Sequence, residues 1–247
     1  MILFVTANDT NMGKTFVTAL LIDCLIQKYD KIAVVKPIES GLRSINKSDL
    51  MFIRNINKKN LNKIDFFNFY SFEEPLAPLT AAILTKTNIK KNKIIDNIYK
   101  LSNFYDIVVV EGVGGLRVPI GKNFEVIDLI KELKAKTILV VSPSLGTINH
   151  TLLSVEALRR RKIRLEGIVI NNYPKKPNIS ELYNPIIFKE NKIKILGVIP
   201  TLTISDSNKL RYSSKKFFAP SLNGEFESKK FLLSCRYQFD KISAKFG

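Results

Sequence analysis

The chain has 247 residues, 45% of them hydrophobic, with 39 Lys and Arg against 22 Asp and Glu and a formal net charge of +17. This length and apolar content suit one α/β domain with a full core, and two cysteines are too few for a disulfide scaffold. No apolar run approaches the roughly 20 residues that span a bilayer, and the N-terminus lacks the features of a signal peptide. We therefore expect a cytoplasmic protein with no membrane partner.

The excess of lysine and arginine raises the question of nucleic-acid binding, because clustered cations gain affinity by releasing counterions from phosphates. The lysines are scattered along the whole chain, however, and accompany asparagine and isoleucine in stretches such as residues 89–95. We interpret them as solvated surface residues, since a charge excess affects solubility and non-specific binding rather than fold. A basic nucleic-acid-binding protein stays a lower-ranked alternative.

Short runs of β-branched residues alternate with longer helical patterns. The apolar runs predict strands at residues 2–6, 32–36, 107–111, 138–141, 167–171 and 195–199. The stretches between them predict helices at 14–27, 48–55, 92–102, 126–134, 148–161 and 179–191. This alternation is typical of an α/β fold with a doubly wound, mostly parallel sheet. We place this single domain at residues 1–204 and predict a C-terminal extension of uncertain order at residues 205–247.

A polar loop follows the first predicted strand and opens the first predicted helix. Its sequence is Asn8-Asp9-Thr10-Asn11-Met12-Gly13-Lys14-Thr15. The Gly-Lys-Thr ending is that of a P-loop, in which backbone amides and a helix N-terminus bind phosphate, the lysine reaches the β- and γ-phosphates and the threonine binds Mg²⁺. Asn8 stands where the common pattern has glycine. We expect it to let the loop turn, because asparagine tolerates the left-handed conformation.

Charged residues follow the next two predicted strands, at the edge of the sheet where ligands bind in such folds. Lys36 precedes Pro37, which lacks an amide hydrogen and is predicted to end the second strand. Glu111 ends an apolar strand, a position that suits a ligand of Mg²⁺, which takes carboxylate and phosphate oxygens. Asp49 follows Ser48 at a helix start, where it is either part of a helix cap or a further Mg²⁺ ligand.

Several segments resemble the dethiobiotin synthetases in order and spacing, over about residues 1–200. They are residues 8–15, 36–41, 48–49, 73–78, 110–115, 145–154 and 167–172. The resemblance implies a P-loop NTPase-like enzyme that uses ATP and Mg²⁺ to close a cyclic urea on 7,8-diaminopelargonic acid with carbon dioxide. The chain departs from the family at Ala7 and Asn11, where glycine and an acidic residue are common. Asn172 stands where aspartate is frequent, which leaves the nucleotide preference open.

The resemblance also implies roles for individual residues. Lys14 and Lys36 would stabilise the charge of the carbamate and the triphosphate, Thr10 would approach the reacting phosphate, and Ser40 would hydrogen-bond the carbamate. The Mg²⁺ ligands would be Thr15, Asp49 and Glu111. The nucleotide would be bound by the loop residues Asn8, Asp9, Thr10, Asn11, Met12, Gly13, Lys14 and Thr15, together with Glu111, Pro200 and Asn171, the last on the adenine ring.

The far end of the diamine substrate carries a carboxylate, which the family holds across a dimer interface. A helix N-terminus is a suitable site for such an anion. A tyrosine of the partner subunit contributes, and the matching residue is Tyr183. The resemblance therefore implies a homodimer. Besides Ser40 and Tyr183, the substrate-binding residues would be Gly114, Ser144, Gly146, Thr147 and Asn149.

Two other P-loop classes are alternatives. Partitioning or site-selection ATPases usually carry an extra lysine early in the loop, where this chain has Ala7, Asn8 and Asp9. Ligases that amidate cobyrinic acid normally need a glutamine-hydrolysing domain, for which this chain has no room. Both alternatives rank below the synthetase.

Overall fold

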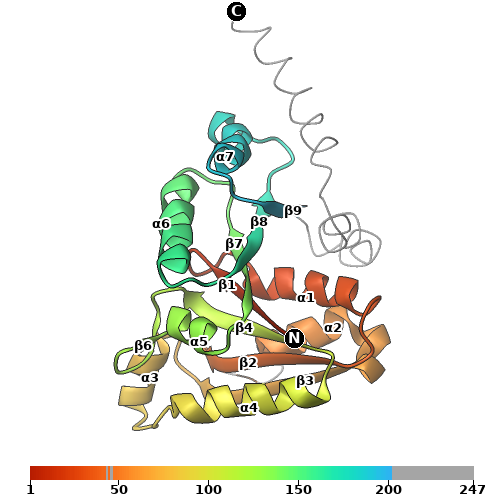
Figure 1. Cartoon of the computed structure of the whole chain (residues 1–247), viewed down its shortest axis with the longest axis vertical. Coiled ribbons are helices and arrows are strands. Elements are labelled where there is room, and N and C mark those ends of the chain that lie inside the picture. Colours follow the sequence, from red (N-terminus) through yellow and green to blue (C-terminus); the bar gives the residue numbers. More distant parts are fainter. Residues whose placement is uncertain (43, 45–46, 202–247) are drawn as a thin grey trace, which may run out of the picture.

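The computed structural model describes residues 1–42, 44 and 47–201, so the predicted extension at 205–247 lies outside the described residues. Within that part, parallel strands form one sheet in the order β3-β2-β4-β1-β7-β8-β9 (Figure 1). The strands are β1 (Ile2–Ala7), β2 (Ile32–Ser40), β3 (Ile64–Phe72), β4 (Ile107–Gly115), β7 (Lys136–Val141), β8 (Leu165–Tyr173) and β9 (Ile195–Pro200). A small antiparallel ribbon of β5 (Pro119–Gly121) and β6 (Phe124–Glu125) follows β4.

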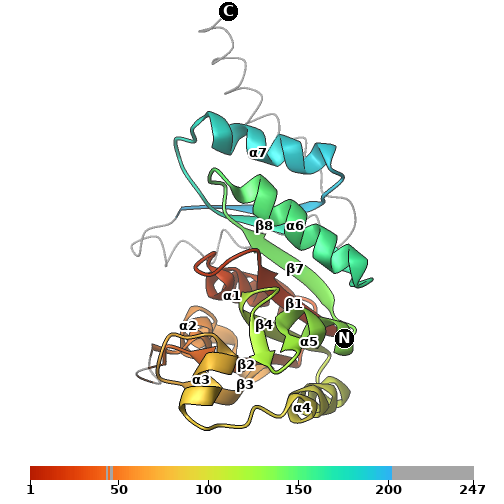
Figure 2. The same cartoon turned by 90° about the vertical axis from the view of Figure 1, so that its left-hand side faces the viewer.

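Helices cover both faces of this sheet (Figure 2). One face packs against α1 (Lys14–Leu25) and α2 (Asp49–Ile56), which leads into a 3₁₀ helix (Lys58–Lys63). The other face packs against α3 (Pro78–Leu84), α4 (Lys91–Phe104), α5 (Val126–Glu132), α6 (Thr147–Arg160) and α7 (Ile179–Glu190). The doubly wound α/β fold predicted from the sequence is confirmed.

The central strand β1 shows why both faces need a cover. Its side chains alternate between the two faces with the period of two that a strand imposes. Leu3 and Val5 join the core beneath α1, whereas Phe4 joins the core beneath α4 and α5. All three side chains are buried, so exposing either face to water would lose the favourable free energy of burying them.

Strand β2 is longer than predicted, and Pro37 does not end it. The pairing of β2 with β4 stops at Val35, opposite Val110, but its pairing with β3 continues to Ser40, opposite Phe72. Pro37 therefore lies where β4 no longer pairs, so its missing amide costs no ladder bond on that side. The extension carries Ser40 and Glu39 to the edge of the sheet that holds the loop residues 8–13.

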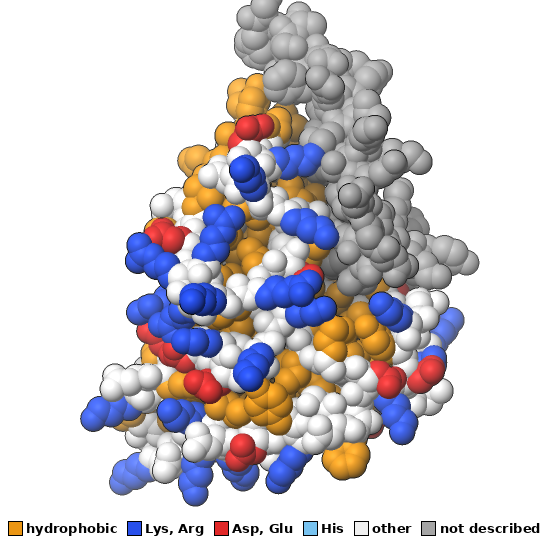
Figure 3. All heavy atoms as spheres, viewed as in Figure 1, with side chains coloured by type: hydrophobic (Ala, Val, Ile, Leu, Met, Phe, Trp, Pro, Cys, Tyr) orange, Lys and Arg blue, Asp and Glu red, His pale blue; other side chains and the backbone are white. Residues whose placement is uncertain are grey.

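Figure 3 shows that lysine and arginine side chains are spread over one face of the molecule among polar and apolar ones, without forming a single continuous patch. This distribution agrees with the interpretation of the lysines as solvated surface residues. Among the described helices, none combines the length and apolarity that a membrane crossing requires.

Candidate functional site

The loop between β1 and α1 is tied to two distant parts of the fold. The Nδ2 amide of Asn171, at the end of β8, donates a hydrogen bond to the carbonyl of Met12 at 2.9 Å. The Nδ2 amide of Asn8 donates to Oγ1 of Thr151 on α6 at 3.2 Å. These bonds fix the loop before any ligand binds, which is the preorganisation that a phosphate site requires.

The left-handed turns of this loop lie at Asn11, with φ 57°, and at Gly13, with φ 80°. The expectation that Asn8 would supply the turn is therefore wrong. Asn8 has a negative φ and uses its side chain to reach Thr151 instead. Gly13 precedes Lys14, the first residue of α1, so the amides at this helix N-terminus line the same loop.

A compact cluster of charged and polar side chains lies at the carboxyl ends of β1, β2 and β4. Lys36 Nζ lies 2.5 Å from Asp49 Oδ2 and 2.7 Å from Glu111 Oε1. It also donates to the carbonyl of Gly112 at 3.2 Å. Thr15 Oγ1 donates to the same Glu111 oxygen at 2.8 Å. Four residues singled out from separate parts of the sequence thus meet at one point.

The environment of this cluster shifts the ionisation of its lysines in opposite directions. Burial, and then the charge of Lys36, lowers the pKa of Lys14 to about 8. Burial also disfavours the charged form of Lys36, but the carboxylates of Glu111 and Asp49 outweigh it, so the pKa of Lys36 is raised. Burial raises the pKa of Asp49, yet the contact with Lys36 prevails and lowers it. Lys36 and Asp49 therefore form a charged pair at neutral pH. An anion bound beside Lys14 would stabilise the charged form of that lysine.

The oxygen atoms of Thr15, Asp49 and Glu111 fit a hard divalent cation such as Mg²⁺. Glu111 is fully buried, and its Oε2 has no hydrogen-bond partner among the described residues. A buried carboxylate oxygen left unpaired is costly unless a ligand uses it. In the described part of the chain, no group of three or more His, Cys, Asp and Glu is arranged to hold a metal ion by itself, so phosphate or water oxygens would have to complete the coordination shell.

A cavity of about 680 Å³ opens beside the cluster. Its lining combines polar groups of the loop, of Lys36 and of Ser40 with residues 75–78, which lead from β3 into α3. The lining residues are Thr10, Asn11, Gly13, Lys14, Thr15, Lys36, Glu39, Ser40, Asp49, Pro75, Leu76, Ala77, Pro78, Glu111, Val113, Gly114 and Val118. This mixture of cations, oxygen ligands and apolar contacts suits a phosphorylated nucleotide beside a partly apolar second substrate.

Comparison with known proteins identifies the family. A family model described as an AAA domain matches residues 2–209. The ATP-dependent dethiobiotin synthetase of Thermodesulfovibrio yellowstonii is 37% identical over 230 residues, which cover 87% of this chain and 95% of that protein. The chain belongs to the dethiobiotin synthetase family. The ATP-dependent dethiobiotin synthetase of Bacillus velezensis is 36% identical over 215 residues, which cover 86% of this chain and 92% of that protein.

Solved structures that resemble this synthetase-family chain confirm the P-loop fold. The septum site-determining protein MinD of Pyrococcus horikoshii superposes with a TM-score of 0.56 at 15% identity, covering 98% of this chain and 96% of its own. A ParA-family ATPase of Chlorobium tepidum superposes with a TM-score of 0.55 at 18% identity, and the match covers 87% of this chain and 90% of that protein. At such low identity the likeness concerns the fold alone.

The other residues that the dethiobiotin synthetase pattern suggested lie outside this cavity. Asn171 is buried beneath the loop, where an added Cβ on Gly13 would come within 2.2 Å of its Nδ2. The residues around the start of α6 and Tyr183 on α7 do not line the cavity either. Thr147 is the buried member of that group, and its Oγ1 has no hydrogen-bond partner within the described ranges.

Two features of the site were missed from the sequence. Glu39 lines the cavity and is buried, and the segment of residues 75–78 forms one wall because β3 carries it there. The signal for Glu39 was present, since a carboxylate inside an otherwise apolar strand is unusual. The wall depends on an edge strand that the periodicity did not reveal.

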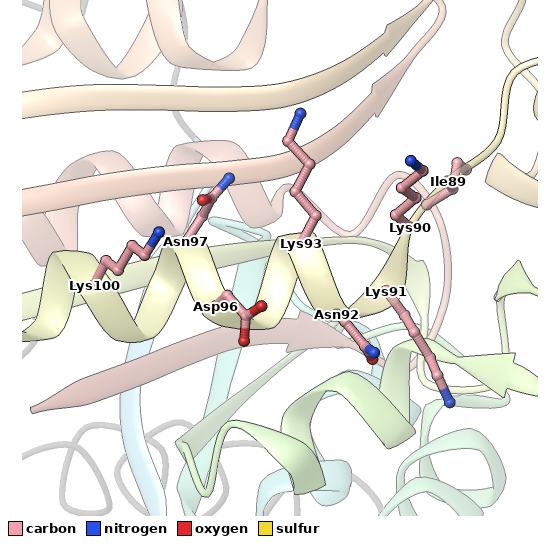
Figure 4. A pocket seen from close by; sticks show the side chains of 8 residues that line it. All are labelled: Ile89, Lys90, Lys91, Asn92, Lys93, Asp96, Asn97 and Lys100. Carbon is pink, nitrogen blue, oxygen red and sulfur yellow. The ribbon is translucent and has the colours of Figure 1, made fainter.

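A second hollow of about 600 Å³ lies along the start of α4 (Figure 4). Figure 4 shows its side chains spreading in different directions from one helix and its approach. They are Ile89, Lys90, Lys91, Asn92, Lys93, Asp96, Asn97 and Lys100. None of them comes from a loop at the carboxyl end of a strand, so this hollow is not part of the candidate site.

Proposed function

We propose that the chain acts as an ATP- and Mg²⁺-dependent dethiobiotin synthetase, a ligase, with residues 1–204 as its catalytic domain in the cytoplasm. Its substrates would be 7,8-diaminopelargonic acid, carbon dioxide and ATP. The observation that carries the proposal is the convergence of Lys14, Lys36, Thr15, Asp49 and Glu111 beside one cavity, in a chain 37% identical to a dethiobiotin synthetase.

The reaction needs charge stabilisation more than it needs a nucleophilic side chain. One amine of the substrate adds to carbon dioxide to give a carbamate, whose oxygen then attacks the γ-phosphate of ATP and displaces ADP, giving a carbamoyl phosphate. The second amine attacks the carbamoyl carbon, loses a proton and displaces phosphate, which closes the ring. Carbamate and triphosphate repel each other, so preorganised cations at their meeting point lower the barrier.

Lys14 and Lys36, which line the same cavity, would supply those cations. Lys14 follows the phosphate loop, and Lys36 is held by Asp49 and Glu111 at 2.5 and 2.7 Å. Ser40 and Thr10 line the same cavity and would donate hydrogen bonds to the carbamate and the reacting phosphate. When bound by Thr15, Asp49 and Glu111, Mg²⁺ would neutralise charge on the β- and γ-phosphates.

The carboxylate of the diamine would bind at the start of α6 in a partner subunit, with Tyr183 of the same partner. Ser144, Gly146 and Asn149 are exposed there, and Thr147 offers a buried hydroxyl that has no hydrogen-bond partner in the described part of the chain. Large apolar side chains are exposed on the same elements: Leu145, just before α6, is 89% exposed, Leu153 on α6 is 57% exposed and Ile179 at the start of α7 is 64% exposed. Exposed apolar groups gathered on two packed helices, α6 and α7, support a homodimer in which each subunit completes the site of the other.

Phosphate release from Mg-ATP tests the activity directly. With bicarbonate present, we expect release only when 7,8-diaminopelargonic acid is added, together with a ureido product detected by mass spectrometry. Lys14→Ala should lower this release by about 10³-fold, because it removes a cation at the transferring phosphate. Lys28→Ala, which changes an exposed lysine just after α1, is the matched control and should leave the rate unchanged. Release that ignores the diamine would instead favour a partitioning-type ATPase.

The dimer has its own test. Leu153→Glu places a charge on the exposed face of α6 and should convert the protein to a monomer, because burying an unpaired carboxylate in an interface is costly. The monomer should show a raised KM for the diamine and little change in ATP binding. Phe104→Glu alters a side chain that is 73% exposed at the end of α4 and should leave the mass unchanged in sedimentation velocity. A wild-type protein that is monomeric and fully active would contradict the shared site.

A further inference from the structure

Glu39 is a buried carboxylate in the cavity wall for which the mechanism above has no use. It lies in β2 between Ile38 and Ser40 and is 6% exposed. Two other carboxylates, Asp49 and Glu111, line the same cavity. A third negative charge beside them destabilises the folded state through repulsion and desolvation. If this residue served only packing, a neutral side chain would destabilise the fold less.

The contact that Glu39 makes is specific. Its Oε1 accepts a hydrogen bond from the backbone N–H of Asp49 at 2.6 Å. Asp49 is the first residue of α2, and the first amides of a helix have no partner within the helix. Ser48, the N-cap, accepts from the amide of Met51 at 3.1 Å. Two side chains therefore hold the first turn of α2, one from within the helix start and one from the sheet.

This contact fixes the backbone of the residue whose side chain enters the charged cluster. Thr15 reaches the cluster from the first turn of α1, which has 12 residues, and Glu111 from within the buried strand β4, whereas Asp49 is the first residue of α2, which has only 8. The Asp49 carboxylate meets Lys36, which belongs to the same strand as Glu39. Strand β2 thus contacts Asp49 at two points. Lys36 pairs with the side chain of Asp49, and Glu39 accepts a hydrogen bond from its backbone.

We propose that Glu39 is a positioning residue, which holds the backbone of Asp49 so that its carboxylate faces Lys36 and the divalent-cation site. The idea rests on the proposed function only in assigning the cation to Thr15, Asp49 and Glu111. Partners that orient a metal ligand typically change the metal affinity by about 10- to 100-fold when they are removed. An effect of that size on cation binding is the signature of the role.

The test measures Mn²⁺, a spectroscopic substitute for Mg²⁺, bound to the full-length protein with a non-hydrolysable ATP analogue by electron paramagnetic resonance. Glu39→Ala should weaken Mn²⁺ binding by at least about tenfold. Glu39→Gln keeps an oxygen that can accept from the Asp49 amide and should stay within about threefold of the wild type, since only the charge of the acceptor is lost. Glu73→Ala removes an exposed carboxylate just after β3 and is the matched control.

Three results would overturn the proposal: Mn²⁺ binding unchanged in Glu39→Ala, an equal loss in Glu39→Gln, or no Mn²⁺ binding by the wild type. An equal loss in the glutamine variant would mean that the charge of Glu39 itself acts on the cation or the substrate. If Glu39→Ala does not fold, Ser48→Ala, which loosens the same helix start, should weaken Mn²⁺ binding in its place. Because the readout needs no diamine, failure of the synthetase assignment would appear separately, as phosphate release that does not depend on the diamine.

Discussion

Lys36→Met is expected to lower diamine-dependent phosphate release by about 10³-fold, because it removes a preorganised cation from the point where carbamate and phosphate charges meet. Methionine has a similar length and can fill the space of the lysine stem, so the loss should reflect charge rather than packing. The measurement is kcat for phosphate release at saturating ATP, bicarbonate and diamine. A rate within about tenfold of the wild type would contradict the role of Lys36 as a principal cation of the transition state, because tenfold corresponds to only about 1.4 kcal/mol.

The same substitution should also destabilise the fold. The side chain of Lys36 is 5% exposed and that of Glu111 is fully buried, so removing the cation leaves a buried carboxylate without its counter-charge. Breaking a buried pair in this way costs about 3–5 kcal/mol. Chemical denaturation without divalent cations measures this loss. Lys63→Met is the control, because the 2.6 Å pair of Lys63 with Asp30 lies on the surface and should add nothing measurable. Equal stability of the two variants would contradict the account of the cluster.

The elements predicted correctly are those whose signal is local. Strands such as β1 and β4 are continuous apolar runs because helices cover both of their faces, and the P-loop is a short motif directly after a buried strand. Strand β3 escaped prediction because it is an edge strand, in which Asp65, Asn68 and Ser71 interrupt the aromatic residues. Its pairing partner β2 determines its structure more than its own sequence does.

The contacts within the site depend on the fold and could not be obtained from spacing. Asn8 and Thr151 are 143 positions apart, and the bond between them explains why Asn8 need not turn the loop. The continuation of β2 past Pro37 depends on which neighbour pairs at that point, which no residue of β2 reveals alone. The sequence could therefore predict that Lys36, Asp49 and Glu111 lie at one edge, but not that Lys36 bridges the two carboxylates.

Gly13→Ala is expected to weaken ATP binding by about 100-fold, the order of loss that follows a shift of about 1 Å in a positioned group. Two independent costs act at this position. The φ of +80° is strained for any residue with a Cβ, and the added methyl group would lie 2.2 Å from Nδ2 of Asn171. Since Asn171 also holds the carbonyl of Met12, displacing it would release the loop from the end of β8.

Two other glycines separate these costs. Gly146→Ala carries the strain of a φ of +90° but meets no atom within 4 Å, and Gly121→Ala has neither strain nor a contact closer than 4.0 Å. If collision with Asn171 dominates, calorimetric titration with the ATP analogue should show a large loss of affinity only in Gly13→Ala, with both controls close to the wild type. If the unfolding free energy of Gly13→Ala falls no further than that of Gly146→Ala and its affinity is retained, the loop must accommodate a Cβ. In that case the Asn171–Met12 bond does not hold the phosphate loop in its binding conformation.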